Sequence, residues 1–98
     1  MIRRIIIRPE ADADIEEAYR WYEKQRDGLG ADFLLCVEDG LARIQRDPEM
    51  YPVVHKNVHR TLIRRFPYGI FYLIENNVIV VLSVFHGRRD PKRWKSRS

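Results

Sequence analysis

Residues 68–86 read YGIFYLIENNVIVVLSVFH and carry the strongest structural signal in the chain. Two apolar runs, Tyr68–Glu75 and Val78–His86, are rich in β-branched and aromatic residues, which favour strands. Asn76-Asn77 separates them, and asparagine tolerates the positive φ of a tight hairpin turn. The second run has almost no polar position. We therefore predict a β-hairpin whose second strand lies inside a sheet and is covered on one face by helices.

The residues before this hairpin have the period of two amphipathic helices. The first begins at Pro9, a residue suited to the first helical turn, and acidic side chains follow it at the positive end of the helix dipole. Asp27-Gly28-Leu29-Gly30 separates the helices, and Asp47-Pro48 ends the second, because the residue before a proline disfavours helical backbone. The stripes expected to face the core are Ala11, Ile15, Ala18, Tyr19 and Tyr22 in the first helix and Phe33, Leu34, Val37, Leu41 and Ile44 in the second.

Two more segments, Ile2–Ile7 and Arg60–Phe66, are predicted to be strands. In the latter, Arg64 and Arg65 should point to opposite faces. The order strand, helix, helix and three strands predicts an α+β fold, with an antiparallel helical hairpin on one face of a small, mainly antiparallel sheet. We expect a single domain over residues 1–98 that ends in a basic tail at about 91–98.

The formal net charge of +4 conceals an uneven distribution. Between Pro9 and Glu49 there are twelve acidic and five basic side chains, whereas Met50–Ser98 has ten basic and two acidic ones. Fourteen of the eighteen Lys and Arg residues are arginine, whose planar guanidinium suits phosphates and carboxylates. The carboxyl-terminal half is therefore expected to bind an anionic partner, either a nucleic acid or an acidic polypeptide.

Composition argues against several classes of protein. A lone cysteine, Cys36, cannot form an internal disulfide, and with three scattered histidines it cannot supply a zinc cage. The glycines form no phosphate-binding loop. The longest apolar run is far shorter than the roughly 20 residues of a membrane span, and the first residues lack the apolar stretch of a signal peptide. We expect a cytoplasmic protein without membrane contact, cofactor or metal.

The candidate site lies at the exit of the last strand, in the segment Phe85-His86-Gly87-Arg88-Arg89-Asp90. A histidine, whose imidazole can act as an acid or a base, would suit cleavage of RNA at its own 2′-hydroxyl when it lies beside arginines that bind phosphate. The side chains that neighbouring strands could add are Arg60, Arg64, Arg65 and Tyr68. The alternative is that Arg88, Arg89 and Asp90 form only surface ion pairs, each worth under about 1 kcal/mol. Spacing alone favours neither interpretation.

The chain resembles toxins of the RelE/ParE superfamily of bacterial toxin–antitoxin systems. The likeness covers Ile2 to about Trp94 and implies the same helical hairpin on a sheet, with the first strand pairing at the sheet edge. It also implies a cognate antitoxin whose acidic carboxyl-terminal segment folds across the toxin. The residues that carry the likeness are Pro9-Glu10-Ala11 with Asp14, Ile15 and Ala18, then Tyr19-Arg20-Trp21-Tyr22, Arg64–Tyr68 with Ile70 and Tyr72, and His86–Asp90.

The resemblance leaves two targets open. Toxins similar to RelE cut mRNA in the ribosomal decoding site, whereas toxins similar to ParE poison DNA gyrase and are not nucleases. RelE-like nucleases carry an arginine after the aromatic residue that opens the core strand, where this chain has Gly69. They often place a tyrosine after the last strand, where only Trp94 follows here. The His86–Asp90 ending is more similar to ParE, so the resemblance favours a gyrase inhibitor.

The two readings assign different roles to the same basic residues. A gyrase inhibitor would bind its target through Arg60, Arg64, Arg65, Arg88, Arg89, Lys92 and Arg93. A ribosome-dependent nuclease would use Arg65, His86 and Arg88 as catalytic residues, with Tyr68 as an auxiliary. A third possibility is an inactive member of the family.

Overall fold

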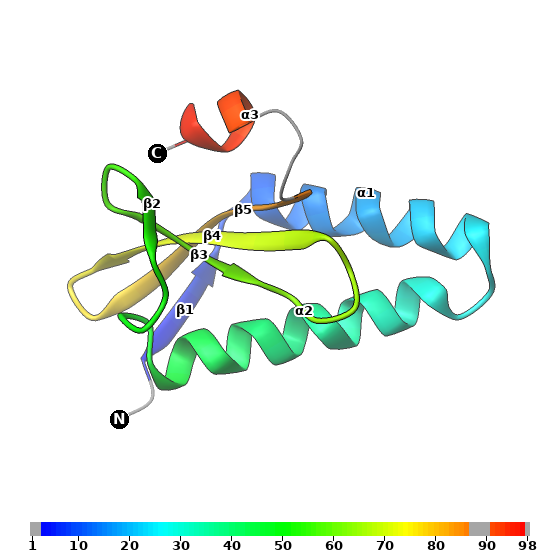
Figure 1. The fold of residues 1–98 in the computed structure, drawn as a ribbon, viewed down its shortest axis with the longest axis horizontal. Coiled ribbons are helices and arrows are strands. Elements are labelled where there is room, and N and C mark those ends of the chain that lie inside the picture. The colour runs from blue at the N-terminus through cyan, green and yellow to red at the C-terminus, as the bar shows by residue number, and fades with distance from the viewer. Residues whose placement is uncertain (1–2, 87–90, 98) are drawn as a thin grey trace.

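The computed structural model describes residues 3–86 and 91–97. Figure 1 shows the helical hairpin lying against a sheet, with the short third helix on the far side of the strands. The described elements are β1 (Arg4–Ile7), α1 (Pro9–Gln25), α2 (Leu29–Arg46), β2 (Val53–His55), β3 (Val58–Leu62), β4 (Tyr68–Glu75), β5 (Val78–His86) and α3 (Pro91–Lys95). This order confirms the predicted α+β fold.

The sheet has five strands in the order β1-β5-β4-β3-β2. β1 pairs in parallel with β5, and every other pair is antiparallel. The predicted hairpin is confirmed as β4–β5, and its turn residues Asn76 and Asn77 have φ of 49° and 65°. β5 lies between β1 and β4, which confirms both its internal position and the expected pairing of the first strand at the sheet edge.

The strand predicted over Arg60–Phe66 was wrong in its bounds. β3 starts earlier, ends at Leu62 and pairs with the additional short strand β2. The chain then turns toward α2, and Arg65 has φ of 70°, which a strand does not allow. Arg64 therefore lies with Arg65 in the loop before β4, and the two do not alternate across a strand.

Buried apolar side chains from α1, α2, β4 and β5 form the larger core cluster, which includes Ala18, Phe33, Ile70 and Val81. The two helices pack closely at Gly30, where a Cβ atom would lie 2.7 Å from the carbonyl oxygen of Tyr19. The start of α2 is capped from α1, because the Glu23 carboxylate accepts hydrogen bonds from the amides of Gly28 and Gly30 at 3.0 and 2.9 Å.

A second cluster covers the opposite face of the sheet. Trp94 of α3 is buried and stacks on Phe71 of β4 at a centroid distance of 4.3 Å. Leu73, Val80 and Leu82 complete this cluster together with Val58. The basic tail expected at about 91–98 therefore includes a helix that packs on the sheet, and the interior of β5 is buried on both faces.

A bulge interrupts the β4–β5 ladder and is stabilised by a buried carboxylate. Leu82 is the extra residue, because Phe71 pairs with Ser83 whereas the next residue, Tyr72, pairs with Val81. Just beyond the bulge, the backbone amide of Val84 donates a hydrogen bond to Asp14 of α1 at 3.2 Å.

Asp14 also forms a bidentate ion pair with Arg97, at 2.6 and 3.3 Å. Arg97 donates further hydrogen bonds to the Ser83 hydroxyl at 3.1 Å and the Leu82 carbonyl at 3.4 Å. The Asp14 side chain is 4% exposed and that of Arg97 17%. This ion pair joins α1, the β5 bulge and the segment that follows α3.

Arg97→Ala should lower the free energy of unfolding by about 3 kcal/mol, because it leaves the buried Asp14 carboxylate without its counter-charge. Arg20→Ala is the matched control, since Arg20 pairs with Glu16 on the exposed surface of α1 and should contribute under about 1 kcal/mol. Urea unfolding of both variants measures the difference. Equal losses would show that the Asp14–Arg97 pair does not stabilise the fold.

Tyr72 is fully buried, and its hydroxyl donates a hydrogen bond to the Pro48 carbonyl at 2.6 Å. Burial, with smaller contributions from Tyr51 and Asp47, raises the pKa of Tyr72 above its usual value. The unfolded chain therefore ionises this group first, so its contribution to stability is complete below about pH 10 and is lost as the pH rises further.

Tyr72→Phe should cost about 1 kcal/mol at neutral pH, because the hydrogen bond to Pro48 is lost. Above about pH 10 the stability of the wild-type protein should fall more steeply than that of the variant. Unfolding by urea between pH 7 and about pH 11 compares the two. Parallel pH profiles would contradict this expectation.

Candidate functional site

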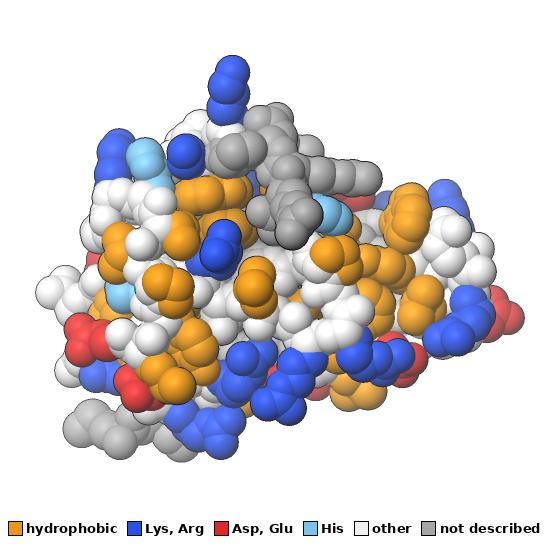
Figure 2. Space-filling view, in the orientation of Figure 1, with side chains coloured by type: hydrophobic (Ala, Val, Ile, Leu, Met, Phe, Trp, Pro, Cys, Tyr) orange, Lys and Arg blue, Asp and Glu red, His pale blue; other side chains and the backbone are white. Residues whose placement is uncertain are grey.

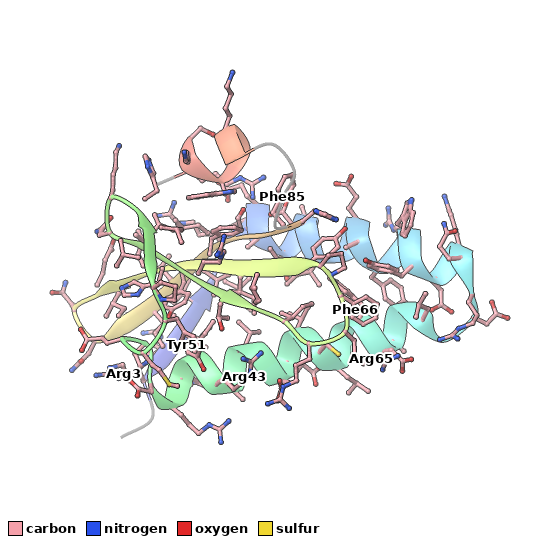
Figure 3. The ribbon with its side chains drawn as sticks, in the orientation of Figure 1. Arg3, Arg43, Tyr51, Arg65, Phe66 and Phe85 are labelled. Atoms are coloured by element: carbon pink, nitrogen blue, oxygen red, sulfur yellow. The ribbon has the colours of Figure 1, made fainter. Side chains whose placement is uncertain are left out.

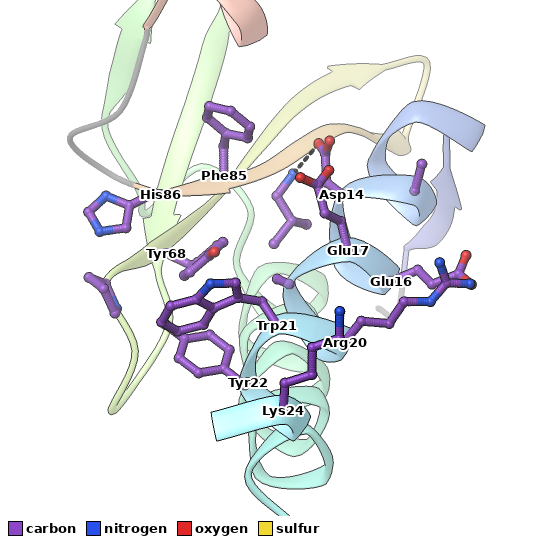
Figure 4. A pocket seen from close by; sticks show the side chains of 14 residues that line it. Asp14, Glu16, Glu17, Arg20, Trp21, Tyr22, Lys24, Tyr68, Phe85 and His86 are labelled. Atoms are coloured by element: carbon purple, nitrogen blue, oxygen red, sulfur yellow. Dashed lines mark hydrogen bonds and ion pairs between the residues drawn. The ribbon is translucent and has the colours of Figure 1, made fainter. Parts of the chain in front are cut away.

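A groove with a volume of about 930 Å³ opens between α1 and the end of the β4–β5 hairpin. Figure 4 shows Trp21 and Glu17 of α1 on one side and Tyr68 and His86 on the other. Tyr68 and His86 are paired across the two strands, and their ring centroids lie 5.7 Å apart. The structure thus brings together two of the residues predicted for the nuclease site.

The aromatic wall of the groove is continuous with the core. The Tyr22 and Phe66 ring centroids lie 4.8 Å apart, and Phe33 packs on Phe66 and Tyr68 at 5.3 and 5.1 Å. Trp21 meets Tyr22 edge-on at 5.0 Å but is 55% exposed. The wall is consequently fixed by packing, while Trp21 forms an accessible rim.

The charges on the α1 side of the groove are mixed. Glu16 and Glu17 line it together with Arg20 and Lys24, and Glu16 is paired with Arg20. The imidazole of His86 and the hydroxyl of Tyr68 are groups that can hold or transfer a proton. The helix adds no excess of positive charge beside them, so this side of the groove has little attraction for a phosphodiester.

Arg64 and Arg65 are directed to α2. The Arg65 guanidinium lies 3.4 Å from Asp32 and over the Phe66 ring at 5.6 Å, and Figure 3 shows it beside that helix. Arg64 lies 3.8 Å from Asp39. Both pairs are solvent-exposed and should contribute little to stability. Arg65 therefore interacts with α2, whereas His86 faces the groove beside α1.

Arg60 lies on the opposite face of the sheet, because it pairs with Phe71, whose ring belongs to the cluster beneath α3. Its aliphatic stem packs over Gly69, where a Cβ atom would lie 3.2 Å from the Cγ of Arg60. Lys92 is exposed on α3, to which Arg93 also belongs. Arg88 and Arg89 lie outside the described residues.

The structure adds three residues that the sequence did not single out for a site. Trp21 stood in the family likeness without a role, and only its exposure reveals it as a groove rim. Arg43 of α2 binds Asp39 at 3.1 Å and donates to the Leu62 carbonyl at 3.1 Å. Arg97 reaches Asp14 across 83 positions of sequence, so no local pattern could have identified it.

Basic side chains gather beyond the groove, along α2 and the loop before β4, where Figure 2 shows a blue row. Arg43, Arg64 and Arg65 belong to this surface and contact the α2 carboxylates. Over residues 3–86 and 91–97, no three His, Cys, Asp or Glu side chains are grouped to hold a metal ion. No described helix is both long and apolar enough to cross a membrane.

Solved toxin–antitoxin proteins share this fold. The chain superimposes with a TM-score of 0.78 on a chain of the chromosomal ParDE system from P. aeruginosa, at 13% identity, covering 87% of this chain and 96% of the other. A chain of the RelBE2 complex from Mycobacterium tuberculosis gives 0.62 at 17% identity, covering 88% and 99%. An E. coli RelE mutant in the free state gives 0.63 at 14% identity, covering 99% and 94%.

Sequence comparison goes further than the fold. The chain is 26% identical over 92 residues to toxin ParE2 of Mycobacterium tuberculosis, which covers 93% of this chain and 88% of the relative. A family model described as the ParE toxin of the type II toxin–antitoxin system parDE matches residues 5–91. The chain therefore belongs to the ParE toxin family, and it is the toxin of a type II toxin–antitoxin system.

Tyr22→Ala and Trp21→Ala should separate the packed wall of the groove from its rim. Tyr22→Ala should lower the free energy of unfolding by about 2–4 kcal/mol, because it removes ring contacts with Phe33, Phe66 and Tyr68. Trp21→Ala should cost about 1 kcal/mol or less. Thermal or urea unfolding checks both, and comparable losses would mean that Trp21 is a core residue.

Proposed function

We propose that this toxin inhibits DNA gyrase in the manner of ParE and acts in the cytoplasm as a single domain over residues 1–98. The observation that carries the proposal is the position of Gly69. RelE-like nucleases have an arginine there, whereas here the stem of Arg60 packs directly over the glycine backbone. A Cβ atom at this position would lie 3.2 Å from the Cγ of Arg60, so any side chain here requires the Arg60 stem to move.

The distribution of cations supports the same proposal. Cleavage of a phosphodiester needs positive groups converging on the phosphate beside an acid and a base. Within the described part of the chain, Arg65 is paired with Asp32 and Arg64 with Asp39, away from the groove that holds His86. Dispersed arginines suit a binding surface better than a catalytic centre. We assign target binding to Arg60, Arg64, Arg65, Arg88, Arg89, Lys92 and Arg93.

A cognate antitoxin is the second proposed partner. The segment Met50–Ser98 carries ten basic and two acidic side chains, which favours binding of an acidic polypeptide. Such a segment can cover exposed apolar side chains of the helical hairpin, including Trp21 and Leu35, and of the edge strand β2, including Val53. The proposed antitoxin folds its acidic carboxyl-terminal segment across these surfaces and neutralises the toxin.

One observation favours the alternative, a ribosome-dependent mRNA endoribonuclease. Tyr68 and His86 face each other at the end of the β4–β5 hairpin and supply groups for proton transfer. In that reading Arg65 and Arg88 stabilise the phosphate charge. His86→Ala or Arg88→Ala would then abolish toxicity while the fold and antitoxin binding are retained.

Induced expression distinguishes the two targets. A gyrase inhibitor should relax plasmid DNA and raise the DNA-damage response while full-length mRNA persists, and the purified protein should inhibit supercoiling in vitro. An Arg64→Gln/Arg65→Gln variant should require several-fold more protein for half-inhibition, because two target-binding charges are lost. Normal supercoiling with transcripts cut at ribosomal A-site codons would overturn the proposal and establish the nuclease. Harmless expression would indicate an inactive member.

A further inference from the structure

Five arginines from three segments of the chain lie along α2. Figure 2 shows basic side chains in a row over this part of the molecule, and Figure 3 shows Arg43 and Arg65 beside the helix. We call this surface the α2 arginine row. It consists of Arg26, which follows α1, Arg43 and Arg46 in α2, and Arg64 and Arg65 in the loop before β4.

Near the start of α2, one carboxylate faces two guanidinium groups. The same Asp32 oxygen lies 3.4 Å from Nη2 of Arg65 and 4.0 Å from Nη2 of Arg26. One negative charge between two positive ones leaves one positive charge without compensation. Both arginine side chains are exposed, so they can turn toward an external anion without losing packing. This end of the row is therefore positive even though its arginines are paired.

The arrangement repeats two turns further along the helix. The same Asp39 oxygen lies 3.1 Å from Nε of Arg43 and 3.8 Å from Nε of Arg64, which again leaves one positive charge. After two more turns comes Arg46, which is exposed and has no carboxylate of residues 3–86 or 91–97 within ion-pair distance. Residues seven apart in a helix lie on one face. The row thus presents three net positive charges in a line.

The spacing of these charges matches a phosphate backbone. Seven residues of α-helix rise about 10 Å, and one strand of duplex DNA rises about 3.4 Å per nucleotide, so neighbouring charges are about three nucleotides apart. Guanidinium groups donate hydrogen bonds in a planar arrangement that phosphate oxygens accept. An exposed, straight line of charges suits the outside of a duplex, whose phosphates repeat regularly. An acidic polypeptide has no such fixed charge period.

The same face offers little that could read a base edge. Between the charges it carries Leu35, which is exposed. The one amide side chain of α2 is Gln45, and it donates to the Arg3 carbonyl at 2.7 Å. The third acidic residue of the helix, Glu38, lies about 100° around the axis from Asp39 and therefore off the row. Contacts to phosphates position a protein on DNA but carry no sequence information, so binding here would be independent of sequence.

We propose that the α2 arginine row binds the phosphate backbone of duplex DNA without reading its sequence. The inference rests on the proposed function, because an inhibitor of gyrase meets the duplex that this enzyme holds. Arg64 and Arg65, already assigned to target binding, then contact the DNA part of the target. Arg26, Arg43 and Arg46 join them as further target-binding residues.

Fluorescence anisotropy with the full-length toxin and a labelled duplex tests the row. Arg26→Gln/Arg46→Gln removes the two ends of the row and should raise the Kd about fivefold to tenfold at low salt. The slope of log Kd against log salt concentration should fall by about two, because two fewer counterions are released. Arg20→Gln/Lys24→Gln is the matched control, since it removes two exposed charges of α1 beside the other groove. It should change the Kd by less than about twofold.

Equal losses in the two variants would mean that only net charge matters and would overturn the row as the site. Failure of the wild-type toxin to bind the duplex would overturn it as well. So would tighter binding of a polyglutamate peptide or a single-stranded RNA that depends on Arg26 and Arg46. Unfolding curves of both variants confirm that the fold is retained.

A supercoiling assay separates this inference from the proposed function. Several-fold more Arg26→Gln/Arg46→Gln variant than wild type should be needed to inhibit gyrase by half. If the variant inhibits as strongly as wild type, the DNA contact is overturned while gyrase inhibition stands. If the wild-type toxin binds DNA through the row but leaves gyrase active, the proposed function is overturned and the row remains a DNA-binding surface.

Discussion

The Asp14 carboxylate holds together three parts of the chain, namely α1, the β5 bulge and the segment that follows α3. It accepts the Val84 amide just past the β5 bulge and pairs with Arg97, which in turn donates to Leu82 and Ser83. A bulge leaves backbone groups outside the regular ladder, and a buried carboxylate is costly unless its oxygens are fully bonded. Here the Val84 amide next to the bulge donates to the carboxylate, so both groups are hydrogen-bonded. The end of β5 that carries His86 is thereby fixed relative to α1.

The surface of the described residues falls into three regions that differ in charge and apolar character. The groove between α1 and the β4–β5 end has an aromatic wall and mixed charge. The α2 side carries arginines that are paired with carboxylates, and the end of β3 carries one, Arg60, that has no such partner in the described residues. The described part of the chain therefore presents some of its arginines paired with carboxylates along α2 and one without such a pair at the end of β3.

The sequence predicted the features that depend on local periodicity and turn chemistry. The two helices, the Asn76-Asn77 hairpin and the internal position of β5 follow from apolar spacing and from residues that tolerate positive φ. The bounds of β3 could not be predicted from the same signals, because all of Arg60–Phe66 has the composition of a strand. In the structure the strand ends at Leu62, and Arg65 adopts a left-handed backbone where the chain turns toward α2. A contact between residues far apart in sequence, such as Asp14 with Arg97, cannot be predicted from the periodicity of apolar residues.

The candidate site was predictable only in part for the same reason. Tyr68 and His86 belong to one hairpin, which brings them to the same end of the sheet, but their direct pairing depends on the bulge at Leu82, which shifts the register set by the turn by one residue. The contact of Arg65 with α2 could not be predicted, since it depends on the path of a loop. Gly69 differs from the arginine of related nucleases in the sequence itself, whereas the packing of the Arg60 stem over it depends on the fold.

The parallel pairing of β1 with β5 also bears on the order in which the molecule forms. Arg4 lies opposite Val78, so the first strand has no partner until almost the whole chain is available. The helical hairpin has local contacts and can assemble early, whereas closing the sheet requires contacts between distant residues and is slow. The groove is lined by α1 and by the open end of the β4–β5 hairpin, so it exists only once the carboxyl-terminal strands have packed beside the first helix. A chain whose carboxyl-terminal strands have not yet packed therefore lacks the groove, which is acquired together with the sheet.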